Sequence, residues 1–457
     1  MHQINEIKNI CCIGAGFVGS PTMAVLAKYC PDINVTVVDI NKDKISSWNS
    51  IDVKDFPVFE KGLGELILKT RGRNLFFSVD IEKSISNADM VFISVNTPTK
   101  QSGFGAGYAS DLKYVESSAR QVAKYSSGHT IVVEKSTVPV RTAELIKEIL
   151  ISSLSKKENL NKTFSVISSP EFLAEGTAIN DLENPDRVLI GGEDNDAIRS
   201  LSSIYEKWIP SEKILFTNVW SSELTKLTAN AFLAQRISSI NAVSALCEAT
   251  GAEVNEVANA IGADKRIGEK FLDAGPGFGG SCFQKDILNL VYLCKYYGLE
   301  NISRYWEEVL LVNNWQKERI ASLIVEKLFG TVTNKKIALF GFSFKADTND
   351  TRESPGISIS KHLIDNGAKL MITDPQVSSD QIERELCLKE GKKFQDQGSW
   401  NFTKDIKVCV NDADAIVILT AWKEYENLDF FALGKLMRKP SWLFDTRKII
   451  SLNNLKG

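Results

Sequence analysis

Short apolar runs alternate with amphipathic stretches through the first third of the chain, and each run ends at a glycine or a polar loop. Ile7–Ile13 is such a run and predicts a strand, and Pro21–Tyr29 predicts the helix after it. Asn34–Asp39 is rich in β-branched residues and predicts a second strand that ends in an acid. Strands and helices that alternate in this way are typical of a parallel α/β sheet.

Three further strands are predicted in this third, each followed by a polar loop that carries a proline. Their apolar runs are Ala88–Val95, Thr130–Glu134 and Phe164–Ser168. In a doubly wound sheet the carboxyl ends of the strands line the ligand crevice, although any one of these loops alone could equally be an ordinary turn. The loop residues that we expect to point into one site are Thr97, Thr137, Glu171 and Glu175.

A glycine-rich turn separates the first predicted strand from the first helix. Its residues are Gly14, Ala15, Gly16, Phe17, Val18 and Gly19. Strand, glycines, helix, strand and terminal acid in this order favour a dinucleotide site, because the glycines permit a tight turn, close approach of a pyrophosphate and close helix packing. Asp39 would accept hydrogen bonds from the ribose and repel a 2′-phosphate, so NAD is favoured over NADP despite nearby Lys44. The alternative is a βαβ unit that binds no nucleotide.

The middle of the chain is predicted to be helical. From Ser221 to about Ala260, apolar residues recur every three or four positions, after a capping signal at Ser221. We expect this helix to bridge two domains and to offer a dimer surface. Lys226 and Asn230 are four residues apart and share one helix face. A lysine on a helix is usually solvated, but Lys226 lies in a mostly apolar segment, where it could stabilise an oxyanion.

The last third repeats the pattern of the first. After a helix predicted over Trp306–Leu328, the predicted strands are Lys335–Gly341, Lys369–Asp374, Ala413–Thr420 and Trp442–Asp445. The glycine fingerprint after the first of these strands is degenerate, so we expect no second dinucleotide there. Residues suited to a nucleotide-like anion, or else ordinary surface charge, are Phe344, Lys345, Arg352 and Arg447.

The whole pattern predicts an α/β fold with two Rossmann-like doubly wound domains joined by a long central helical region. We expect an NAD-binding domain over residues 1–212, a central helical domain over 213–328 and a second Rossmann-like, nucleotide-type domain over 329–457.

The stretch Gly277–Asp286 carries three glycines followed by Cys282. The glycines allow the backbone to lie against a ligand. A helix that begins near Ser281 would place Cys282 in its first turn, where the helix dipole favours a thiolate. This suggests a nucleophilic cysteine beside a bound anion, and the alternative is a buried, inert cysteine after a glycine turn.

Composition narrows the class of protein. A chain of 457 residues predicts two or three domains, and a net charge of −3 does not favour nucleic acid or an anionic membrane as partner. No apolar run approaches the roughly 18 residues of a membrane span. Eight scattered cysteines, without a secretory signal, predict free thiols in a cytoplasmic protein. With three histidines and no ligand cluster we expect no metal, so acid–base work falls to Asp, Glu, Lys or Cys.

Seven motifs in order make the chain resemble the UDP-glucose/GDP-mannose dehydrogenase family, and its animal-type members most. They are Gly14–Gly19, Ser94–Thr99, Glu134–Val140, Pro170–Gly176, Leu224–Asn230, Gly277–Cys282 and Gly341–Lys345. The resemblance covers nearly the whole chain. It implies two-step oxidation of UDP-glucose to UDP-glucuronate with NAD, through a thiohemiacetal and a thioester on Cys282.

By this resemblance Lys226 and Asn230 would steady the oxygen at C6, Asp286 with a water would move protons, and Thr137 would help to hold a catalytic water. Glu171 would supply an acid–base carboxylate. The implied catalytic residues are Cys282, Lys226, Glu171, Asp286, Asn230 and Thr137.

The family's ligand contacts carry over as two sets. The cofactor set is Gly14, Ala15, Gly16, Phe17, Val18, Gly19, Asp39, Lys44, Val95, Asn96, Thr97, Pro98, Thr99, Ser136, Thr137, Val138, Glu175 and Arg352. The substrate set is Glu171, Phe172, Leu173, Ala174, Glu175, Lys226, Asn230, Arg266, Phe271, Phe278, Gly279, Phe344, Lys345 and Arg447. Arg266 would reach a neighbouring subunit of a homo-oligomer, a dimer through the central helix and a hexamer overall.

Two segments depart from the animal-type pattern. Asp273 stands where we expect a lysine, and an acid there would weaken or reroute a nucleotide contact. Gly103–Tyr108 carries fewer basic residues than expected and resembles a mobile insertion, which puts family-type regulation in doubt.

Two other classes of function compete with this one. A two-electron dehydrogenase of the 2-hydroxyacid type would use a lysine without a nucleophilic cysteine, so Cys282 discriminates against it. A catalytically silent NAD-binding scaffold would not need Cys282, Lys226 and Asp286 together. The choice of UDP-glucose over other sugar nucleotides depends on family likeness alone.

Overall fold

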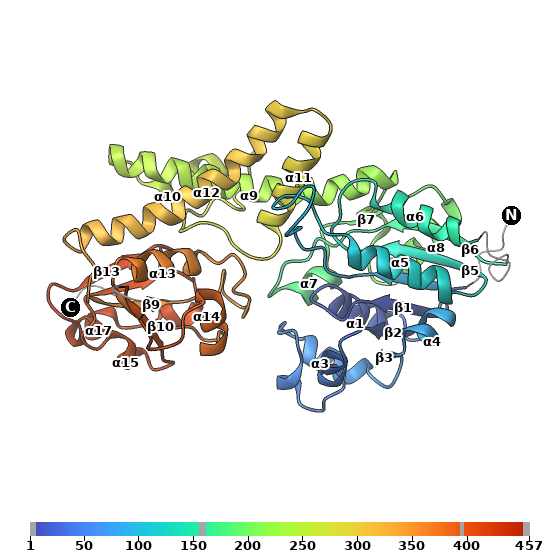
Figure 1. The fold of residues 1–457 in the computed structure, drawn as a ribbon, viewed down its shortest axis with the longest axis horizontal. Helices are drawn as coiled ribbons and strands as arrows, with labels where there is room; N and C mark the ends of the chain where they lie inside the picture. Colours follow the sequence, from blue (N-terminus) through green and yellow to red (C-terminus); the bar gives the residue numbers. More distant parts are fainter. Residues whose placement is uncertain (1–5, 155–160, 394–396, 451–457) are drawn as a thin grey trace. The chain divides into compact units, whose positions relative to one another are not determined.

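The computed structural model describes residues 6–154, 161–393 and 397–450. It contains two α/β domains with parallel sheets, joined by a long central helix, as the sequence pattern predicted (Figure 1). The chain forms two compact units. One holds residues up to Ala229 together with Leu288–Gly298, and the other holds Asn230–Ile287 and the residues from Leu299 onward.

The first unit is built on an eight-stranded sheet. In spatial order its strands are β3 (Leu75–Ser78), β2 (Asn34–Val38), β1 (Asn9–Ile13), β4 (Met90–Ile93), β5 (His129–Glu134), β6 (Thr163–Ser168), β7 (Val188–Gly192) and β8 (Ile214–Thr217). All pairs are parallel except β6 with β7. The order reverses between β1 and β4, and this switch point is where an open α/β sheet forms its ligand crevice.

Helices cover both faces of this sheet. They are α1 (Gly19–Tyr29), α2 (Lys42–Trp48), α3 (Leu63–Thr70), α4 (Ile81–Ser86), α5 (Lys113–Tyr125), α6 (Thr142–Ser153), α7 (Ala178–Glu183) and α8 (Asn195–Tyr205). Adjacent residues of β1 point to opposite faces. Cys12 belongs to the core formed with α1, α3 and α8, whereas Cys11 belongs to the core formed with α5 and α6.

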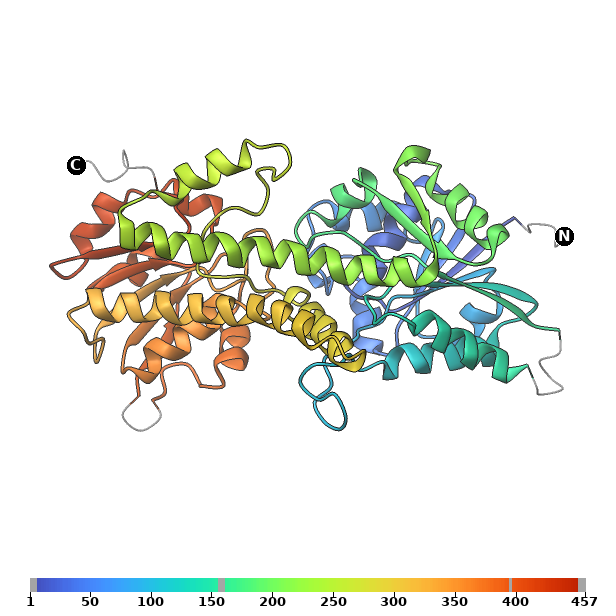
Figure 2. The same ribbon diagram turned by 90° about the horizontal axis from the view of Figure 1, so that it is seen from above.

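The central segment contains the longest helices. α9 (Val219–Thr250) is a continuous helix of 32 residues, seen along its length in Figure 2. It is followed by α10 (Val254–Gly262), α11 (Phe283–Tyr296) and α12 (Glu300–Lys327).

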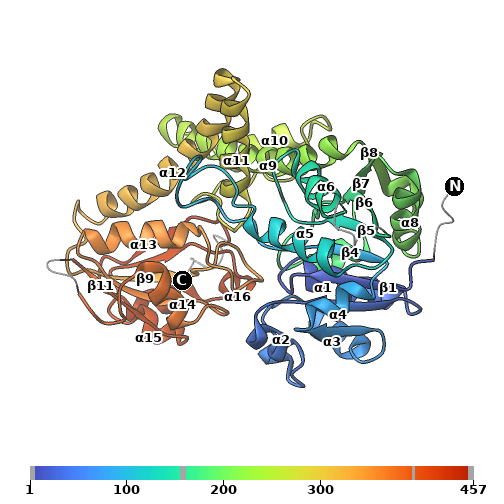
Figure 3. The same ribbon diagram turned by 45° about the vertical axis from the view of Figure 1, so that its right-hand side comes forward.

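The second unit contains a five-stranded parallel sheet. Its strands are β11 (Ser399–Phe402), β10 (Lys369–Thr373), β9 (Lys336–Phe340), β12 (Ala415–Ile418) and β13 (Trp442–Asp445). Its helices are α13 (Pro355–Asp365), α14 (Ser379–Leu386), α15 (Ile406–Val410), α16 (Lys423–Glu426) and α17 (Phe430–Leu436). Helices α13 and α15 lie on opposite faces of the sheet (Figure 3), which makes this domain doubly wound as well.

Three local predictions differ from the structure. The helix expected from Ser221 to about Ala260 ends at Thr250, because Gly251 adopts a positive φ of +80°. Its predicted cap at Ser221 is wrong, since α9 already begins at Val219 and Asn218 accepts the hydrogen bond from the Ser221 N–H. The helix expected from Trp306 begins at Glu300.

Two general features bear on the type of protein. All eight cysteines are free thiols. Within the described residues, no helix has both the length and the apolar character needed to cross a membrane.

Candidate active site

The glycine turn after β1 has the geometry of a dinucleotide cradle. Gly14 has a φ of +113°, and a Cβ atom there would lie 2.1 Å from the Ser94 carbonyl oxygen. A Cβ at Gly19 would lie 2.1 Å from the Gly14 carbonyl oxygen, which shows how closely α1 packs on the turn. At Gly16, in contrast, nothing lies within 4 Å of the Cβ position. The open space at Gly16 and the N-terminus of α1 behind it fit a pyrophosphate.

Asp39 follows β2, the strand next to β1, and its side chain lies beside this cradle. Its carboxylate accepts hydrogen bonds from the Ala15 N–H at 3.1 Å and the Asn41 N–H at 3.0 Å, and it pairs with the Lys44 ammonium at 3.1 Å. Partial burial would raise the pKa of Asp39, but the two N–H groups and Lys44 together hold it below its usual value. Asp39 is therefore an ionised acceptor beside the cradle.

The second unit repeats this turn but fills its space. Gly14 donates its N–H to the Val38 carbonyl, and Gly341 donates to the Thr373 carbonyl, both at 2.8 Å. Buried Asp374 accepts from the N–H of Phe342 at 2.7 Å, as Asp39 does from Ala15. Ser343 stands where the first turn has Gly16, so a side chain occupies the position that the first cradle leaves open.

Polar side chains tie together the loops at the carboxyl ends of β4 and β5. The Ser136 hydroxyl accepts from the Val95 N–H at 2.9 Å and donates to the Val95 carbonyl at 2.8 Å. The Thr97 hydroxyl donates to the Thr137 carbonyl at 2.7 Å. These contacts join the predicted cofactor segments Val95–Thr99 and Ser136–Val138 at the edge of the sheet.

Glu171 lies at the carboxyl end of β6 in an ion pair with Lys135, at 3.0 Å. Its other oxygen accepts from the N–H groups of Phe172 at 2.8 Å and Leu173 at 3.1 Å. Lys226 of α9 is buried, and its ammonium lies 5.3 Å from the centroid of the Phe172 ring. The predicted residues Glu171, Phe172 and Lys226 therefore belong to one cluster in the first unit.

Two buried carboxylates that support these loops were missed in the sequence. Glu60 accepts from the Gly176 N–H at 2.7 Å and from the Ala178 N–H at 3.3 Å, which fixes the turn after Glu175. Glu223 accepts from the N–H groups of Arg141 and Ala143, each at 2.7 Å, at the start of α6. The partners lie 116 and 118 positions from Glu60 and 82 and 80 positions from Glu223 in the sequence, and no local pattern marks such a contact.

Cys282 lies in the second unit immediately before α11 and is exposed. A buried, inert cysteine therefore does not describe it. The expected first-turn position is one residue off, since α11 begins at Phe283, but the Cys282 carbonyl accepts the Asp286 N–H at 2.9 Å, so Cys282 is still part of the helix N-terminus. The Ser281 hydroxyl lies 3.4 Å from its sulfur.

Asp286 is buried one turn after Cys282. Its carboxylate accepts a hydrogen bond of 2.6 Å from the Asn230 side-chain amide and pairs with the Lys285 ammonium at 3.1 Å. Asn230 in turn follows Lys226 by one turn of α9. The structure thus links Asp286, Asn230 and Lys285 around the first turn of α11.

Three buried amide side chains hold the backbone of the glycine loop before Cys282. The Asn313 side chain of α12 accepts from the Phe278 N–H at 2.8 Å and donates to the Phe278 carbonyl at 3.1 Å. Asn241 accepts from the Gly275 N–H at 2.8 Å, and Gln316 donates to the Gly275 carbonyl at 2.9 Å. The loop is therefore fixed although it is neither helix nor strand.

The same loop packs against the sugar-nucleotide residues predicted in the last third. A Cβ at Gly279 would lie 2.5 Å from the Glu353 carbonyl oxygen, and one at Gly280 would lie 3.0 Å from the Phe344 ring. The Gly280 N–H donates to the Arg352 carbonyl at 2.8 Å. The glycines are required because aromatic and backbone atoms occupy the space of a side chain.

The predicted cations of this unit differ in their surroundings. Arg447 is half-buried, donates to the Leu419 carbonyl at 2.7 Å and lies against Gly275. Burial lowers the pKa of Arg447 to about 10, and the negative charge of Asp273 opposes that shift, so Asp273 faces Arg447. Arg352 is paired with Asp350 at 2.6 Å. Arg266 is exposed and paired with Asp264 at 2.6 Å.

The remaining predicted contacts are aromatic. Phe278 is buried and packs edge-to-face on Phe283, with ring centroids 5.7 Å apart, whereas Phe271 is more exposed and lies 6.5 Å from the same ring. The Lys345 ammonium lies 5.6 Å from the Phe344 ring. Phe104 of the Gly103–Tyr108 segment is 80% exposed, with its ring packed edge-on against Tyr292.

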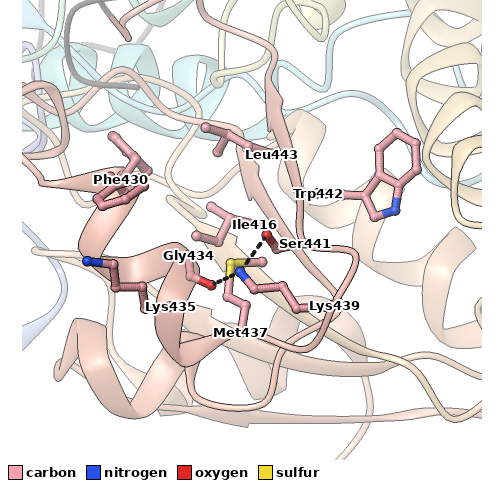
Figure 4. A pocket seen from close by; sticks show the side chains of 10 residues that line it. Ile416, Phe430, Gly434, Lys435, Met437, Lys439, Ser441, Trp442 and Leu443 are labelled. Carbon is pink, nitrogen blue, oxygen red and sulfur yellow. Dashed lines mark hydrogen bonds between the residues drawn. The ribbon is translucent and has the colours of Figure 1, made fainter. Parts of the chain in front are cut away.

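A pocket of about 320 Å³ lies elsewhere in the second unit, beside α17 and the starts of β12 and β13 (Figure 4). Its lining includes Phe430, Met437, Trp442 and two lysines, and Lys439 donates to Gly434 and Ser441. The pocket contains no carboxylate or cysteine, so it does not match the chemistry of the Cys282 region.

Comparison with known proteins agrees with this geometry. Three family profiles match in order: the NAD binding domain of the UDP-glucose/GDP-mannose dehydrogenase family at residues 8–209, its central domain at 220–315 and its UDP binding domain at 338–452. The chain belongs to the UDP-glucose/GDP-mannose dehydrogenase family. It is therefore similar throughout its length to NAD-dependent oxidoreductases, and NAD is its cofactor.

Individual members of this family are close in sequence and structure. The chain is 56% identical over 451 residues to a UDP-glucose 6-dehydrogenase of Mus musculus, covering 97% of this chain and 90% of the relative. It is 51% identical to UDP-glucose 6-dehydrogenase 4 of Arabidopsis thaliana, covering 98% and 94%. A UDP-glucose dehydrogenase structure from Pyrobaculum islandicum matches with a TM-score of 0.84 at 30% identity, covering 97% and 95%.

The cradle geometry predicts opposite effects for two similar substitutions. Gly16→Ala adds a methyl group where the protein leaves open space, so the free protein should keep its thermal stability but lose NAD affinity, by at least about tenfold. Gly19→Ala drives a methyl group into backbone and should lower the unfolding free energy by about 1–3 kcal/mol. Thermal melts and NAD titration by calorimetry separate the two. Equal NAD affinity in Gly16→Ala and the unaltered protein would contradict this assignment of the cradle.

The hydrogen bonds of Asn313 to the glycine loop predict that Asn313→Ala lowers the stability of the protein. It leaves the Phe278 N–H and carbonyl without their buried partner, so the unfolding free energy should fall by about 2–3 kcal/mol and turnover should fall with it. Asn314→Ala is the matched control, because Asn314 is the next residue of α12 and is exposed. Denaturant unfolding of both variants is the measurement, and equal stability would show that Asn313 does not hold the loop.

Proposed function

We propose that this chain oxidises UDP-glucose at C6 to UDP-glucuronate in two NAD-dependent steps, through a covalent intermediate on Cys282. The observation that carries the proposal is an exposed cysteine at the N-terminus of α11, one turn from the buried Asp286–Asn230 pair. The family membership and the identity to UDP-glucose 6-dehydrogenases support the choice of reaction. A cysteine in this position suits addition to an aldehyde carbon.

The proposed oxidation has four stages. The C6 alcohol loses a hydride and a proton to become an aldehyde. The Cys282 sulfur then adds to the aldehyde carbon as a thiohemiacetal, and loss of a second hydride and proton leaves a thioester. Water adds to the thioester, the C–S bond breaks, and the carboxylate leaves with Cys282 restored as a thiol.

When bound, NAD supplies the acceptor for each of the two hydrides. The residues that would hold it are Gly14–Gly19 with the N-terminus of α1, Asp39, and the loops joined by Ser136 and Thr97. Arg352, now paired with Asp350, and Glu175, beside the Glu60-held turn, complete the proposed cofactor set.

The protein's own groups would manage charge and protons at C6. Lys226 and Asn230, one turn apart on α9, would stabilise negative charge on the C6 oxygen. Asp286, which already accepts from Asn230, would receive the alcohol proton through a water and return protons during hydrolysis. Thr137, half-buried after β5, would help to hold the attacking water.

The sugar nucleotide would be held mainly by the glycine loop and the last domain. We propose that Phe278 and Gly279 line the nucleotide and that Phe344, Lys345 and Arg447 supply aromatic and cationic contacts. Asp273 faces Arg447 and would weaken the attraction of that cation for a phosphate. Phe172, Leu173, Ala174 and Glu175 of the loop after β6 are the further substrate contacts that we propose.

We further propose domains at residues 1–212, 213–328 and 329–457, and a homo-oligomer assembled through the central helices. Support for the assembly is an apolar surface on that segment, where Phe232 and Leu246 of α9 are 56% and 64% exposed and Trp315 of α12 is 45% exposed. Exposed Arg266 is available to reach a second subunit.

The covalent route predicts a fixed ratio of NADH formed to sugar nucleotide consumed. Purified protein given limiting UDP-glucose and excess NAD should form about two NADH per sugar, since both oxidations occur before product leaves. Absorbance of NADH against chromatographic assay of the sugar nucleotide measures the ratio. One NADH per sugar with a released aldehyde would favour a two-electron dehydrogenase instead. Parallel assays with UDP-galactose, UDP-N-acetyl sugars and GDP-mannose identify the sugar.

The nucleophile is tested by substitution. Cys282→Ala should reduce turnover by at least about a thousandfold, because no thioester can form, while NAD affinity and thermal stability stay near those of the unaltered protein. Cys387→Ala is the matched control, because Cys387 is likewise exposed. Loss of folding or of NAD affinity in Cys282→Ala alone would mean that Cys282 has a structural role.

A further inference from the structure

The helix α6 begins without a cap from its own sequence. Arg141, the residue before it, has a φ of +80°, and its side chain makes no capping hydrogen bond to the first turn. The Arg141 guanidinium instead pairs with Glu144 at 3.5 Å and lies 5.3 Å from the centroid of the Trp220 ring. A non-glycine residue in the left-handed region is strained, so this backbone requires partners from elsewhere in the fold.

Glu223, near the start of α9, supplies the missing cap. Its side chain is buried, and its two oxygens accept from the N–H groups of Arg141 and Ala143, each at 2.7 Å. A carboxylate suits this place, because the N-terminus of a helix is the positive end of its dipole and hydrogen bonds to a charged acceptor are strong. The start of α6 is therefore fixed to α9 by one carboxylate.

A second buried carboxyl group, that of Glu134, lies near Glu223. Glu134 is the last residue of β5, is 1% exposed and lies opposite Ser168 of β6 in the register of the sheet. Among the residues that the structure describes, none has hydrogen-bond geometry to either Glu134 oxygen, although the Ser168 hydroxyl lies close enough to favour the charged form. Burial, and then the negative charge of Glu223, raise the pKa of Glu134 well above its usual value. Glu134 is therefore a neutral carboxylic acid near neutral pH.

The charge of Glu223 is more evenly balanced. Burial raises its pKa to about 7, the N–H groups at the start of α6 oppose that rise, and Glu144 adds to it. The charged side chains at this end of α6 are Glu144 and Arg141, which pair with each other, and β5 contributes Glu134. Glu223 therefore gains and loses its proton near neutral pH, whereas Glu134 keeps its own.

The loop that joins β5 to α6 carries proposed cofactor residues. Ser136 and Thr137 lie in it, and both are hydrogen-bonded to the loop after β4. The last residue of the loop is Arg141, whose N–H group is bound by Glu223. One end of the loop is thus anchored by the sheet and the other by the Glu223 carboxylate, so a change of charge at Glu223 alters how firmly the loop is held.

We propose that Glu223 is a positioning residue for the cofactor site: its carboxylate holds the β5–α6 loop for NAD, and protonation of that carboxylate loosens the loop and weakens NAD binding. A proton on Glu223 turns one acceptor oxygen into a hydroxyl, so the N–H group of Arg141 or Ala143 loses its charged partner. The inference rests on the proposed function only through the assignment of Ser136–Val138 as cofactor contacts.

Calorimetric titration with NAD at two pH values tests the proposal without any substrate. A group with a pKa of about 7 is roughly 10% ionised at roughly pH 6 and roughly 90% ionised at roughly pH 8, so the NAD affinity of the unaltered protein should rise about five- to tenfold between them. Glu223→Gln keeps the size of the side chain but never ionises, so its NAD affinity should be low at both values and change less than about twofold. Asp39 stays ionised throughout, because its pKa is held low.

Two further variants separate Glu223 from its neighbours. His129→Gln removes an exposed histidine at the start of β5, the type of side chain that titrates near neutral pH, and should leave the pH dependence intact. Glu134→Gln imitates the neutral acid and should leave the NAD affinity and the midpoint of its pH dependence unchanged. A midpoint that moves to lower pH in Glu134→Gln would show that Glu134 carries a charge and would contradict its assignment as a neutral acid.

Thermal melting gives a readout that does not involve NAD. The pKa of Glu223 is raised in the folded protein, so its contribution to stability is present at acid pH and is lost as the pH rises through about 7. Glu223→Gln has no such contribution. The melting temperature of the unaltered protein should therefore fall relative to that of Glu223→Gln between roughly pH 5 and roughly pH 8.

A shorter acid covers the case in which Glu223→Gln does not fold. Glu223→Asp keeps the charge, but its side chain cannot reach both N–H groups at the start of α6. Its NAD affinity at the higher pH should then fall to the level that the unaltered protein shows at the lower pH. Unaltered NAD affinity in Glu223→Asp would mean that the cap does not serve the cofactor site.

Three results would overturn the proposal. They are equal NAD affinity of the unaltered protein at both pH values, the same pH dependence in Glu223→Gln, and a change in melting without a change in NAD affinity, which would make Glu223 a purely structural cap. If the expected NAD behaviour is found but no sugar nucleotide is oxidised, the proposed function fails and the role of Glu223 stands. If UDP-glucose is oxidised but NAD affinity does not depend on Glu223, the reverse holds.

Discussion

Backbone N–H and C=O groups in loops have no helix or sheet to pair with, and a buried group of this kind must find another partner. Several loops of this protein meet that requirement with buried side chains. Asn313 satisfies both polar groups of Phe278, Glu60 binds the turn at Gly176, and Glu171 binds the turn at Phe172. Without these partners, glycine-rich segments would have too much conformational freedom to present a fixed surface.

The two sheets carry a glycine turn at equivalent places, but the turns leave different amounts of open space. Each has a glycine turn after its first strand and an aspartate after the next that accepts from the turn's N–H groups. At Gly16 the turn is open, whereas Ser343 fills the corresponding space. The Ser343 side chain therefore occupies the space that Gly16 leaves open, so the same turn in the two domains offers different surfaces to a ligand.

The sequence predicts those parts of the site that depend on local order. The strands, the Gly14–Gly19 turn and Asp39 follow from spacing within about thirty residues, and the helix position of Asn230 follows from periodicity. It does not predict Lys135 or Asn313, because their partners lie 36 and 35 residues away and side-chain contact depends on tertiary packing. The cap at Ser221 was mispredicted for a related reason, since Asn218 competes for the same N–H group.

Histidine is scarce in this chain, so lysines and carboxylates supply the charges of the site. Glu171 pairs with the Lys135 ammonium and accepts from two N–H groups, which hold its pKa below its usual value. Asp286 pairs with the Lys285 ammonium and accepts from the Asn230 amide, one turn after the exposed cysteine. Each of these two carboxylates is therefore held by one lysine and by neutral N–H donors, because a buried charge needs both kinds of partner.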